Sequence, residues 1–108
     1  MNTTQILAAA SELLVTKGWT QGESAKDKDG YCVPSYSPRA TCYCLIGAIE
    51  KVAPSWDGLE ARDALRRVLG VDNIVKWNDT PGRTKEEVLK AIDGAIMSDD
   101  AIMSDNDN

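Results

Sequence analysis

Apolar residues in the first part of the chain recur every three or four positions, the spacing that places them on one face of an α-helix. They are Ile6, Leu7, Ala10, Leu13 and Leu14. Thr3 or Thr4 stands where a capping residue would begin this helix, and Gly18 stands where a helix commonly ends. The pattern therefore predicts a first helix that stops at about Gly18.

The helical spacing is lost between Trp19 and Thr41, where glycine and proline residues accumulate. Within this region the turn sequence of residues 27–30 separates two short segments, residues 24–25 and 31–33. A short hairpin or an ordered loop is expected there. The region is roughly 23 residues long, more than is usual for a structureless connection, which favours a binding element or a small sheet.

A second helix is predicted to open near Ser37-Pro38, because proline is tolerated in a first helical turn, and to run to Ala53 before Pro54. Its apolar stripe is Cys42, Leu45, Ile46, Ile49 and Ala53.

Two more helices follow, one from about residue 57 to 69 that stops at Gly70, and one that begins at Thr84. Glu87, three residues after Thr84, completes a capping-box signal, the clearest helix start in the chain. Between these two helices, residues 71–79 form a short segment that contains Trp77 and precedes a Pro-Gly turn.

These elements predict a mainly α fold, with about four short helices around one core and a long ordered loop or small β-hairpin between helices one and two. A chain of 108 residues fits a single domain. We expect residues 1–97 to form that helical domain. Residues 98–108, which are acidic and carry a near-repeat of residues 95–100, are expected to be a flexible tail.

The net charge of −5 arises at the C-terminal end, because no Lys or Arg follows Lys90. A neutral body without a basic stripe makes nucleic acid an unlikely ligand. No apolar run approaches the ~20 residues needed to span a bilayer. The first residues lack the features of a secretory signal, so we expect the cytoplasm of a bacterial host cell.

The chain contains no histidine, which excludes ordinary Ser-His-Asp and Cys-His enzymes. Its three cysteines include no C-x-x-C pair, so we expect neither a metal nor a cofactor, and the cysteines fit as small apolar fillers. Catalysis would then need carboxylates, a lysine or a bound cofactor, and the residues considered for a small enzyme are Asp79, Glu23 and Cys44.

The side chains best suited to contact a ligand or partner are aromatic rings with a polar group, two arginines one helical turn apart, and a polar pair beside the Pro-Gly turn. Each has a structural alternative: the rings cover the core, the arginines form an exposed charged face, and the polar pair caps the turn. The predicted binding residues are Trp19, Tyr31, Tyr36, Tyr43, Arg62, Arg66, Trp77, Asn78 and Asp79.

Three motifs in order resemble a known family: Lys-Gly-Trp-Thr-Gln-Gly at 17–22, Cys-Leu-Ile-Gly-Ala-Ile at 44–49, and Trp-Asn-Asp-Thr-Pro-Gly-Arg-Thr at 77–84, followed by Glu-Val-Leu at 87–89. The chain is similar over residues 5–97 to domain of unknown function 6197, small uncharacterised proteins from actinobacteria and their phages. The resemblance implies no reaction, cofactor or catalytic residue. It implies an accessory role, such as interference with host defence; the repeated tail departs from the family pattern.

Two classes of function remain open. The first choice is a non-catalytic binding module that sequesters a partner protein, such as a host-defence protein, or a small nucleotide-like ligand. The alternative is a small histidine-independent enzyme that uses carboxylate or Cys chemistry. Self-association also stays open, because a pocket can be built between subunits.

Overall fold

The computed structural model describes the backbone of residues 1–106 and the side chains of residues 1–98. This part of the chain is mainly helical, and a small sheet lies between the first two helices. The elements in order are α1 (Thr3–Thr16), β1 (Ala25–Lys26), β2 (Cys32–Val33), β3 (Cys42–Tyr43), α2 (Leu45–Val52), α3 (Asp57–Leu69), α4 (Ile74–Asn78) and α5 (Lys85–Asn106).

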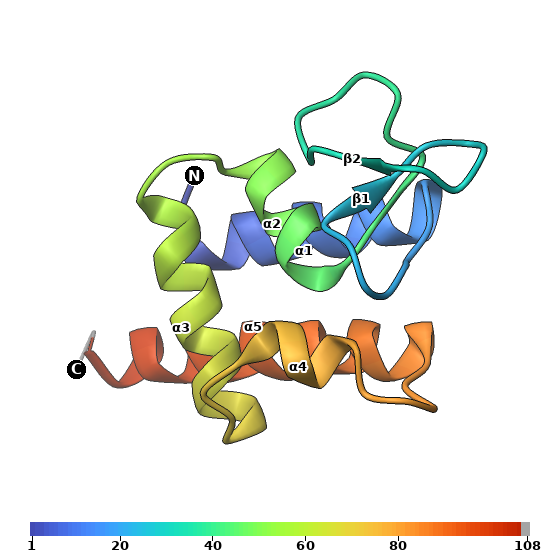
Figure 1. Cartoon of the computed structure of the whole chain (residues 1–108). Helices are drawn as coiled ribbons and strands as arrows, with labels where there is room; N and C mark the ends of the chain where they lie inside the picture. Colours follow the sequence, from blue (N-terminus) through green and yellow to red (C-terminus); the bar gives the residue numbers. More distant parts are fainter. Residues whose placement is uncertain (107–108) are drawn as a thin grey trace.

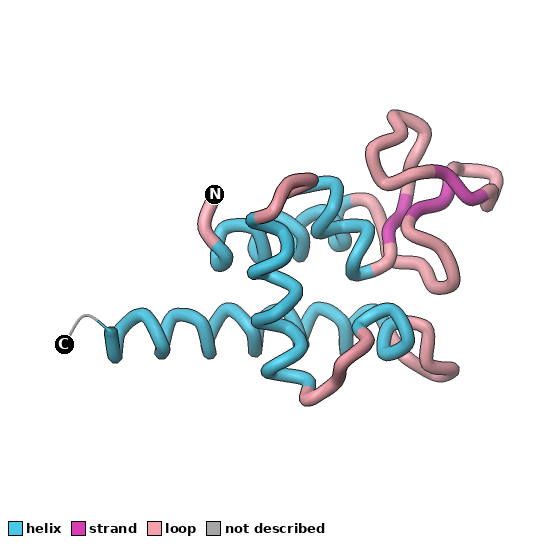
Figure 2. Tube along the Cα trace, turned by 60° about the vertical axis from the view of Figure 1, so that its left-hand side comes forward, coloured by secondary structure: helices cyan, strands magenta, loops and turns pink. Residues whose placement is uncertain are grey.

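The helices pack in two levels around one core (Figure 1). The long helix α5 runs along one side of the molecule, and α1 packs against α5, α2 and α3. The sheet lies at one end of the molecule, beside α2 and away from most of α5 (Figure 2). The core is built from aliphatic side chains at helical spacing, and those with no exposed surface include Ile6, Leu7, Leu14, Leu45, Ile49, Leu65, Val88 and Ile92.

The sheet has the strand order β2-β1-β3, and both pairings are antiparallel. Ala25 is opposite Val33 on one side and Tyr43 on the other. In the turn between β1 and β2, the Asp27 side chain accepts hydrogen bonds from the backbone N–H groups of Asp29 and Tyr31, both at 2.9 Å. The hairpin expected around residues 27–30 is therefore confirmed.

The predicted start of the second helix is wrong, since α2 begins at Leu45 and not near Ser37-Pro38. Cys42, assigned from the sequence to the stripe of that helix, lies in β3, where backbone pairing with β1 holds it extended. Cys44 then caps the helix, because its sulfur accepts from the backbone N–H of Gly47 at 3.2 Å.

The first helix is capped by Asn2 and not by Thr3 or Thr4. The Asn2 side chain accepts from the backbone N–H of Gln5 at 2.8 Å, and the Gln5 side chain accepts in return from the backbone N–H of Asn2. This reciprocal pair satisfies two donors at the helix start.

Residues 71–79 contain the short helix α4, which the apolar spacing did not predict. The capping box predicted at the start of the last helix is confirmed: Glu87 accepts from the backbone N–H of Thr84 at 3.0 Å, and Thr84 Oγ1 accepts from that of Glu87 at 3.2 Å. Helix α5 continues past residue 97, where the sequence placed the start of a flexible tail. The side chains from residue 99 and all of residues 107–108 lie outside the described part, so that expectation stays a prediction. Among the described helices, none is long and apolar enough to cross a bilayer.

Candidate functional site

Asn78, the last residue of α4, is the one polar side chain with no exposed surface that the described residues contain. Its amide oxygen accepts from the indole N–H of Trp19 at 2.7 Å and from the backbone N–H of Leu45 at 3.1 Å. Its amide nitrogen donates to the carbonyl of Thr20 at 3.2 Å and to the carboxylate of Asp79 at 2.9 Å. The two lone pairs and two N–H groups of this amide are thus all used.

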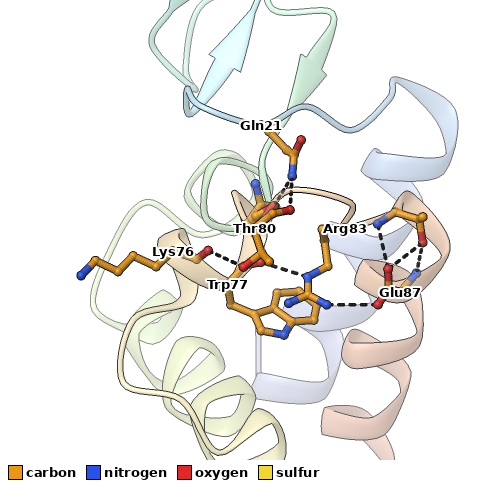
Figure 3. Close-up of polar contacts among 8 residues, drawn as sticks. Gln21, Lys76, Trp77, Thr80, Arg83 and Glu87 are labelled. Carbon is orange, nitrogen blue, oxygen red and sulfur yellow. Dashed lines mark hydrogen bonds and ion pairs between the residues drawn. The ribbon is translucent and has the colours of Figure 1, made fainter.

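Three neighbouring hydrogen bonds extend this arrangement. The side-chain amide of Gln21 donates to the backbone carbonyls of Asn78 at 2.9 Å and Thr80 at 3.0 Å (Figure 3). The carboxylate of Asp79 accepts from the backbone N–H of Gly22 at 2.9 Å. We call these bonds, together with those of the Asn78 side chain, the Asn78 clamp; it joins the segment after α1 to α4 and to the first turn of α2.

The same segment is also fixed directly against α2. A Cβ atom placed on Gly47 would lie 1.9 Å from the carbonyl oxygen of Ser24, so only glycine allows the two backbones to approach this closely. That carbonyl accepts from the backbone N–H of Cys44 at 3.0 Å. The close approach at Gly47 is therefore made with the loop before β1 and not with another helix.

Three hollows lie around α2 near the clamp, each sharing lining residues with the next, and we refer to them together as the trough. The middle hollow, with a volume of about 190 Å³, is bounded by residues 22–24, by the first turn of α2 and by α4. Its lining residues are Gly22, Glu23, Ser24, Cys44, Ile46, Val75 and Asp79. In Figure 1, α2 lies between the sheet and α3.

The trough continues from the middle hollow toward β2. Glu23 and Ser24 also line the second hollow, which has a volume of about 360 Å³ and is completed by the segment from Cys32 to Tyr36 and by Glu50. The ring of Tyr36 is 78% exposed. We call this hollow the tyrosine end of the trough.

In the other direction the trough reaches α3. Ile46 and Val75 line both the middle hollow and the third, which has a volume of about 270 Å³ and is bounded by Arg62 and Arg66. Arg66 makes an ion pair of 2.6 Å with Asp63. We call this hollow the arginine end.

Arg62 is held less firmly than Arg66. Its guanidinium lies 3.8 Å from the carboxylate of Glu50, and its Nε atom is buried without a hydrogen-bond partner. A buried donor without a partner is costly, so this guanidinium gains from an additional acceptor.

The trough as a whole carries more acid than base. Its lining includes four carboxylates, those of Glu23, Glu50, Asp72 and Asp79, against the guanidiniums of Arg62 and Arg66, a net charge of −2. Within the part of the chain that the structure describes, no ion pair involves Glu23 or Asp79. A surface with this balance favours cations over phosphate groups.

Cys44 lies in the middle hollow, where burial raises the pKa of its thiol above the ordinary value of 9.0; the nearby Asp79 carboxylate acts in the same direction. The folded chain thus holds this proton more tightly than the unfolded chain. The resulting stability is fully present below about pH 9 and is lost as the pH rises through the raised pKa. Burial raises the pKa of Tyr43 as well, which adds to the loss from about pH 10 upward.

We therefore expect urea unfolding of Cys44→Ser, measured across the alkaline range, to show a smaller loss of stability above about pH 9 than the wild type. Serine keeps an oxygen acceptor at the helix cap but does not ionise there. Cys42→Ser, which replaces a half-buried thiol in β3, controls for the general effect of the substitution. Equal alkaline slopes for the wild type and Cys44→Ser would contradict the assignment.

Four of the binding residues predicted from the sequence line the trough: Tyr36, Arg62, Arg66 and Asp79. Two more, Trp19 and Asn78, belong to the clamp that fixes its wall. Because Asn78 is fully buried and fully bonded, direct contact between its amide and a ligand would require the clamp to open.

The other three predicted residues lie elsewhere. Tyr43 is 2% exposed and faces the core, whereas Tyr31 is 72% exposed outside the trough lining. Trp77 packs against the core, and the guanidinium of Arg83 lies over its ring, 4.1 Å from the centroid, while also pairing with Glu87 at 3.0 Å (Figure 3).

Sequence reasoning missed several trough residues, namely Ser24, Ile46, Glu50 and Val75. Ile46 and Glu50 are four residues apart on α2 and thus share a helix face, a signal available from the sequence once the helix is correctly placed. Val75 gave no such signal, because its exposure depends on how α4 packs.

The trough lacks a set of ligands for a metal: within the described residues, no group of three or more Cys, Asp or Glu side chains is arranged to hold one. A family model described as a family of unknown function, DUF6197, matches residues 1–98. Neither the curated proteins nor the solved structures provide a significant match.

Proposed function

We propose that this chain, which belongs to the family of unknown function DUF6197, is a non-catalytic binding module whose partner lies in the trough. Because the function of the family is unknown, the support for this binding site comes from the geometry of the trough. The observation that carries the proposal is the continuity of the three hollows, which share lining residues from one to the next. A continuous open trough with a fixed wall suits a segment of polypeptide.

A partner protein fits this trough better than a nucleotide-like ligand. The lining has a net charge of −2, and both of its arginines already have a carboxylate beside them. The phosphate groups of a nucleotide would also meet the carboxylates of Glu23 and Asp79 in the middle hollow. Tyr36 is the one aromatic ring in the described lining, so a base would find no pair of rings to stack between.

The proposed partner is a host protein, such as a host-defence protein, met in the bacterial cytoplasm. This identity is supported by the resemblance to a family with phage members and not by the shape of the trough. Self-association of the chain remains an alternative to a foreign partner, and it would be seen as a dimer in solution.

A second candidate function is a small histidine-independent enzyme. It is favoured by one observation: Glu23, Cys44 and Asp79, the residues considered for such chemistry, all line the middle hollow. Against it, burial raises the pKa of Cys44 and so keeps the thiol in its less nucleophilic, protonated form. One oxygen of Asp79 already accepts two hydrogen bonds within the clamp.

The proposal is tested by placing a charge on the trough floor. Val75 is 47% exposed, so Val75→Glu should leave the fold intact while adding a carboxylate between the two ends of the trough. Val15, which is 56% exposed on α1 and outside the trough, provides the matched variant Val15→Glu. Proteins captured from an actinobacterial lysate by each form are compared by quantitative mass spectrometry.

We expect a partner that is retained by the wild type and by Val15→Glu and is reduced about tenfold or more by Val75→Glu. Retention of the same partners by Val75→Glu would contradict binding in the trough. Sustained multiple-turnover conversion of a substrate, abolished by Asp79→Asn, would instead favour the enzyme.

A further inference from the structure

We infer that the trough takes an extended segment with charges of opposite sign at its two ends, a basic side chain at the tyrosine end and a carboxylate at the arginine end. This inference rests on the proposed function and specifies the chemistry of the partner. It follows from the contact between Glu50 and Arg62, which joins the two ends of the trough.

The tyrosine end is suited to a Lys or Arg side chain. It presents the carboxylates of Glu23 and Glu50 together with the ring of Tyr36, which is 78% exposed. A cation between carboxylates and the face of an aromatic ring is attracted by both. Among the described residues that line this hollow there is no Lys or Arg.

The arginine end offers one guanidinium that is available to a carboxylate. Arg66 is occupied, since its NH1 pairs with Asp63 at 2.6 Å and its Nε donates to the carbonyl of Asp72 at 3.1 Å. Among the described residues, the one ion pair of Arg62 is with Glu50 at 3.8 Å, beyond hydrogen-bond distance, so its terminal NH2 group can turn to another acceptor. A planar guanidinium binds a carboxylate through two parallel hydrogen bonds, which is a stronger contact than this loose pair.

The pair between Glu50 and Arg62 makes the two ends interdependent. A segment with only a basic group would draw Glu50 away and leave Arg62 without its partner, and an acidic group alone would do the reverse. A segment with both charges replaces one loose internal pair by two intermolecular pairs. Ile46 and Val75 lie on the floor between the ends, so the middle of the segment should be apolar.

The test uses synthetic peptides of equal length with blocked termini and a valine-rich middle. One set carries Lys and Glu at opposite ends in either order, because the structure does not fix chain direction. The comparison peptides replace the Glu by Gln or the Lys by Gln. Binding to the full chain is followed by nuclear magnetic resonance titration, with thermal unfolding recorded for each protein form.

We expect the better Lys-and-Glu peptide to bind about tenfold more tightly than either single-charge peptide, and to shift the resonances of residues that line the trough. Glu50→Gln should reduce that advantage to about twofold, because the internal pair and the basic contact are both lost. Glu12→Gln, which removes an exposed carboxylate on α1 outside the trough, should leave the advantage unchanged.

Different results would contradict the charge pattern of the segment and the location of the binding site. Single-charge peptides that bind as tightly as the Lys-and-Glu peptide, or an absence of binding by all peptides, would overturn the inference. If Val75→Glu still abolishes partner capture in those cases, the trough remains the binding site and only the charge pattern is wrong. Loss of peptide selectivity in Glu12→Gln would likewise overturn it, by showing that the effect is not local.

Discussion

Replacement of Asn78 by alanine should lower the free energy of unfolding by about 4 kcal/mol. The change removes the acceptor of the Trp19 indole N–H and the Leu45 backbone N–H, and the donor to the Thr20 carbonyl. Each buried polar group left without a partner costs about 1–3 kcal/mol, and water has little access to a site with no exposed surface. Urea unfolding followed by tryptophan fluorescence measures the loss.

Asn73→Ala is the matched control for this prediction. Asn73 caps α4 from an exposed position, where its side chain accepts one hydrogen bond from the backbone N–H of Lys76 at 3.0 Å. Removal of such a cap costs about 1 kcal/mol. If Asn78→Ala costs no more than Asn73→Ala, the clamp does not hold the fold together.

Asn78→Asp removes the two N–H donors of the side chain but keeps its volume, so it distinguishes the effect of the lost hydrogen bonds from the effect of lost volume. The aspartate keeps the acceptor oxygen but places a second one facing the Thr20 carbonyl and the Asp79 carboxylate, 3.2 Å and 2.9 Å from the present nitrogen. Two facing carboxylates repel, so this variant should be unstable at neutral pH. It should recover part of its stability as the pH is lowered, because protonation of one carboxylate of a facing pair removes the repulsion.

The second large effect is expected at Gly47. Alanine there would place a Cβ atom 1.9 Å from the backbone carbonyl of Ser24, and a backbone group cannot turn aside as a flexible side chain can. The loop must therefore move away from α2, which also breaks the bond from the Cys44 N–H to that carbonyl. We expect Gly47→Ala to lower the free energy of unfolding by about 3 kcal/mol, although alanine favours helix by about 1 kcal/mol.

Gly94→Ala provides a comparison in which the same substitution should be tolerated. The nearest atom to a Cβ at Gly94 is Cγ1 of Val68, at 3.3 Å, and Val68 is 38% exposed and able to adjust. Urea midpoints should show Gly94→Ala close to the wild type or slightly more stable. A Gly47→Ala protein as stable as Gly94→Ala would show that the loop does not press against α2.

Local signals predicted the elements whose structure is determined locally. The capping box of Thr84 and Glu87 marks the start of the last helix, because both partners lie within one turn. Likewise, the turn at residues 27–30 is closed by the Asp27 side chain, which bonds only to its near neighbours. In both places the residues within four positions supply the bonds that fix the backbone.

The start of α2 could not be predicted in this way. Cys42 fits the apolar stripe of a helix, but pairing with β1, more than fifteen residues earlier, holds it extended. Cysteine is also not among the usual capping residues, so Cys44 gave no signal that a helix begins after it. The extended structure of β3 is thus determined by β1, a strand that is distant in the sequence.

In the candidate site, too, some residues are placed by their local spacing and others by contacts between distant parts of the sequence. Arg62 and Arg66 share a face of α3 because of their spacing, and their presence at one hollow follows from that. The meeting of Glu23 with Cys44 and Asp79 depends on the clamp, which joins residues as far as 59 positions apart. Such a convergence leaves no local trace in the sequence.

The wide sequence separation within the clamp also bears on how the chain reaches its native state during synthesis. While the first seventy or so residues emerge from a ribosome, the indole N–H of Trp19 and the first backbone N–H of α2 have no Asn78 to bind. The bonds of the clamp between α4 and the segment that follows α1 can form only after residues 78–80 have been added. The trough is thus completed late, and a nascent chain should be unable to engage a partner through it before most of the domain exists.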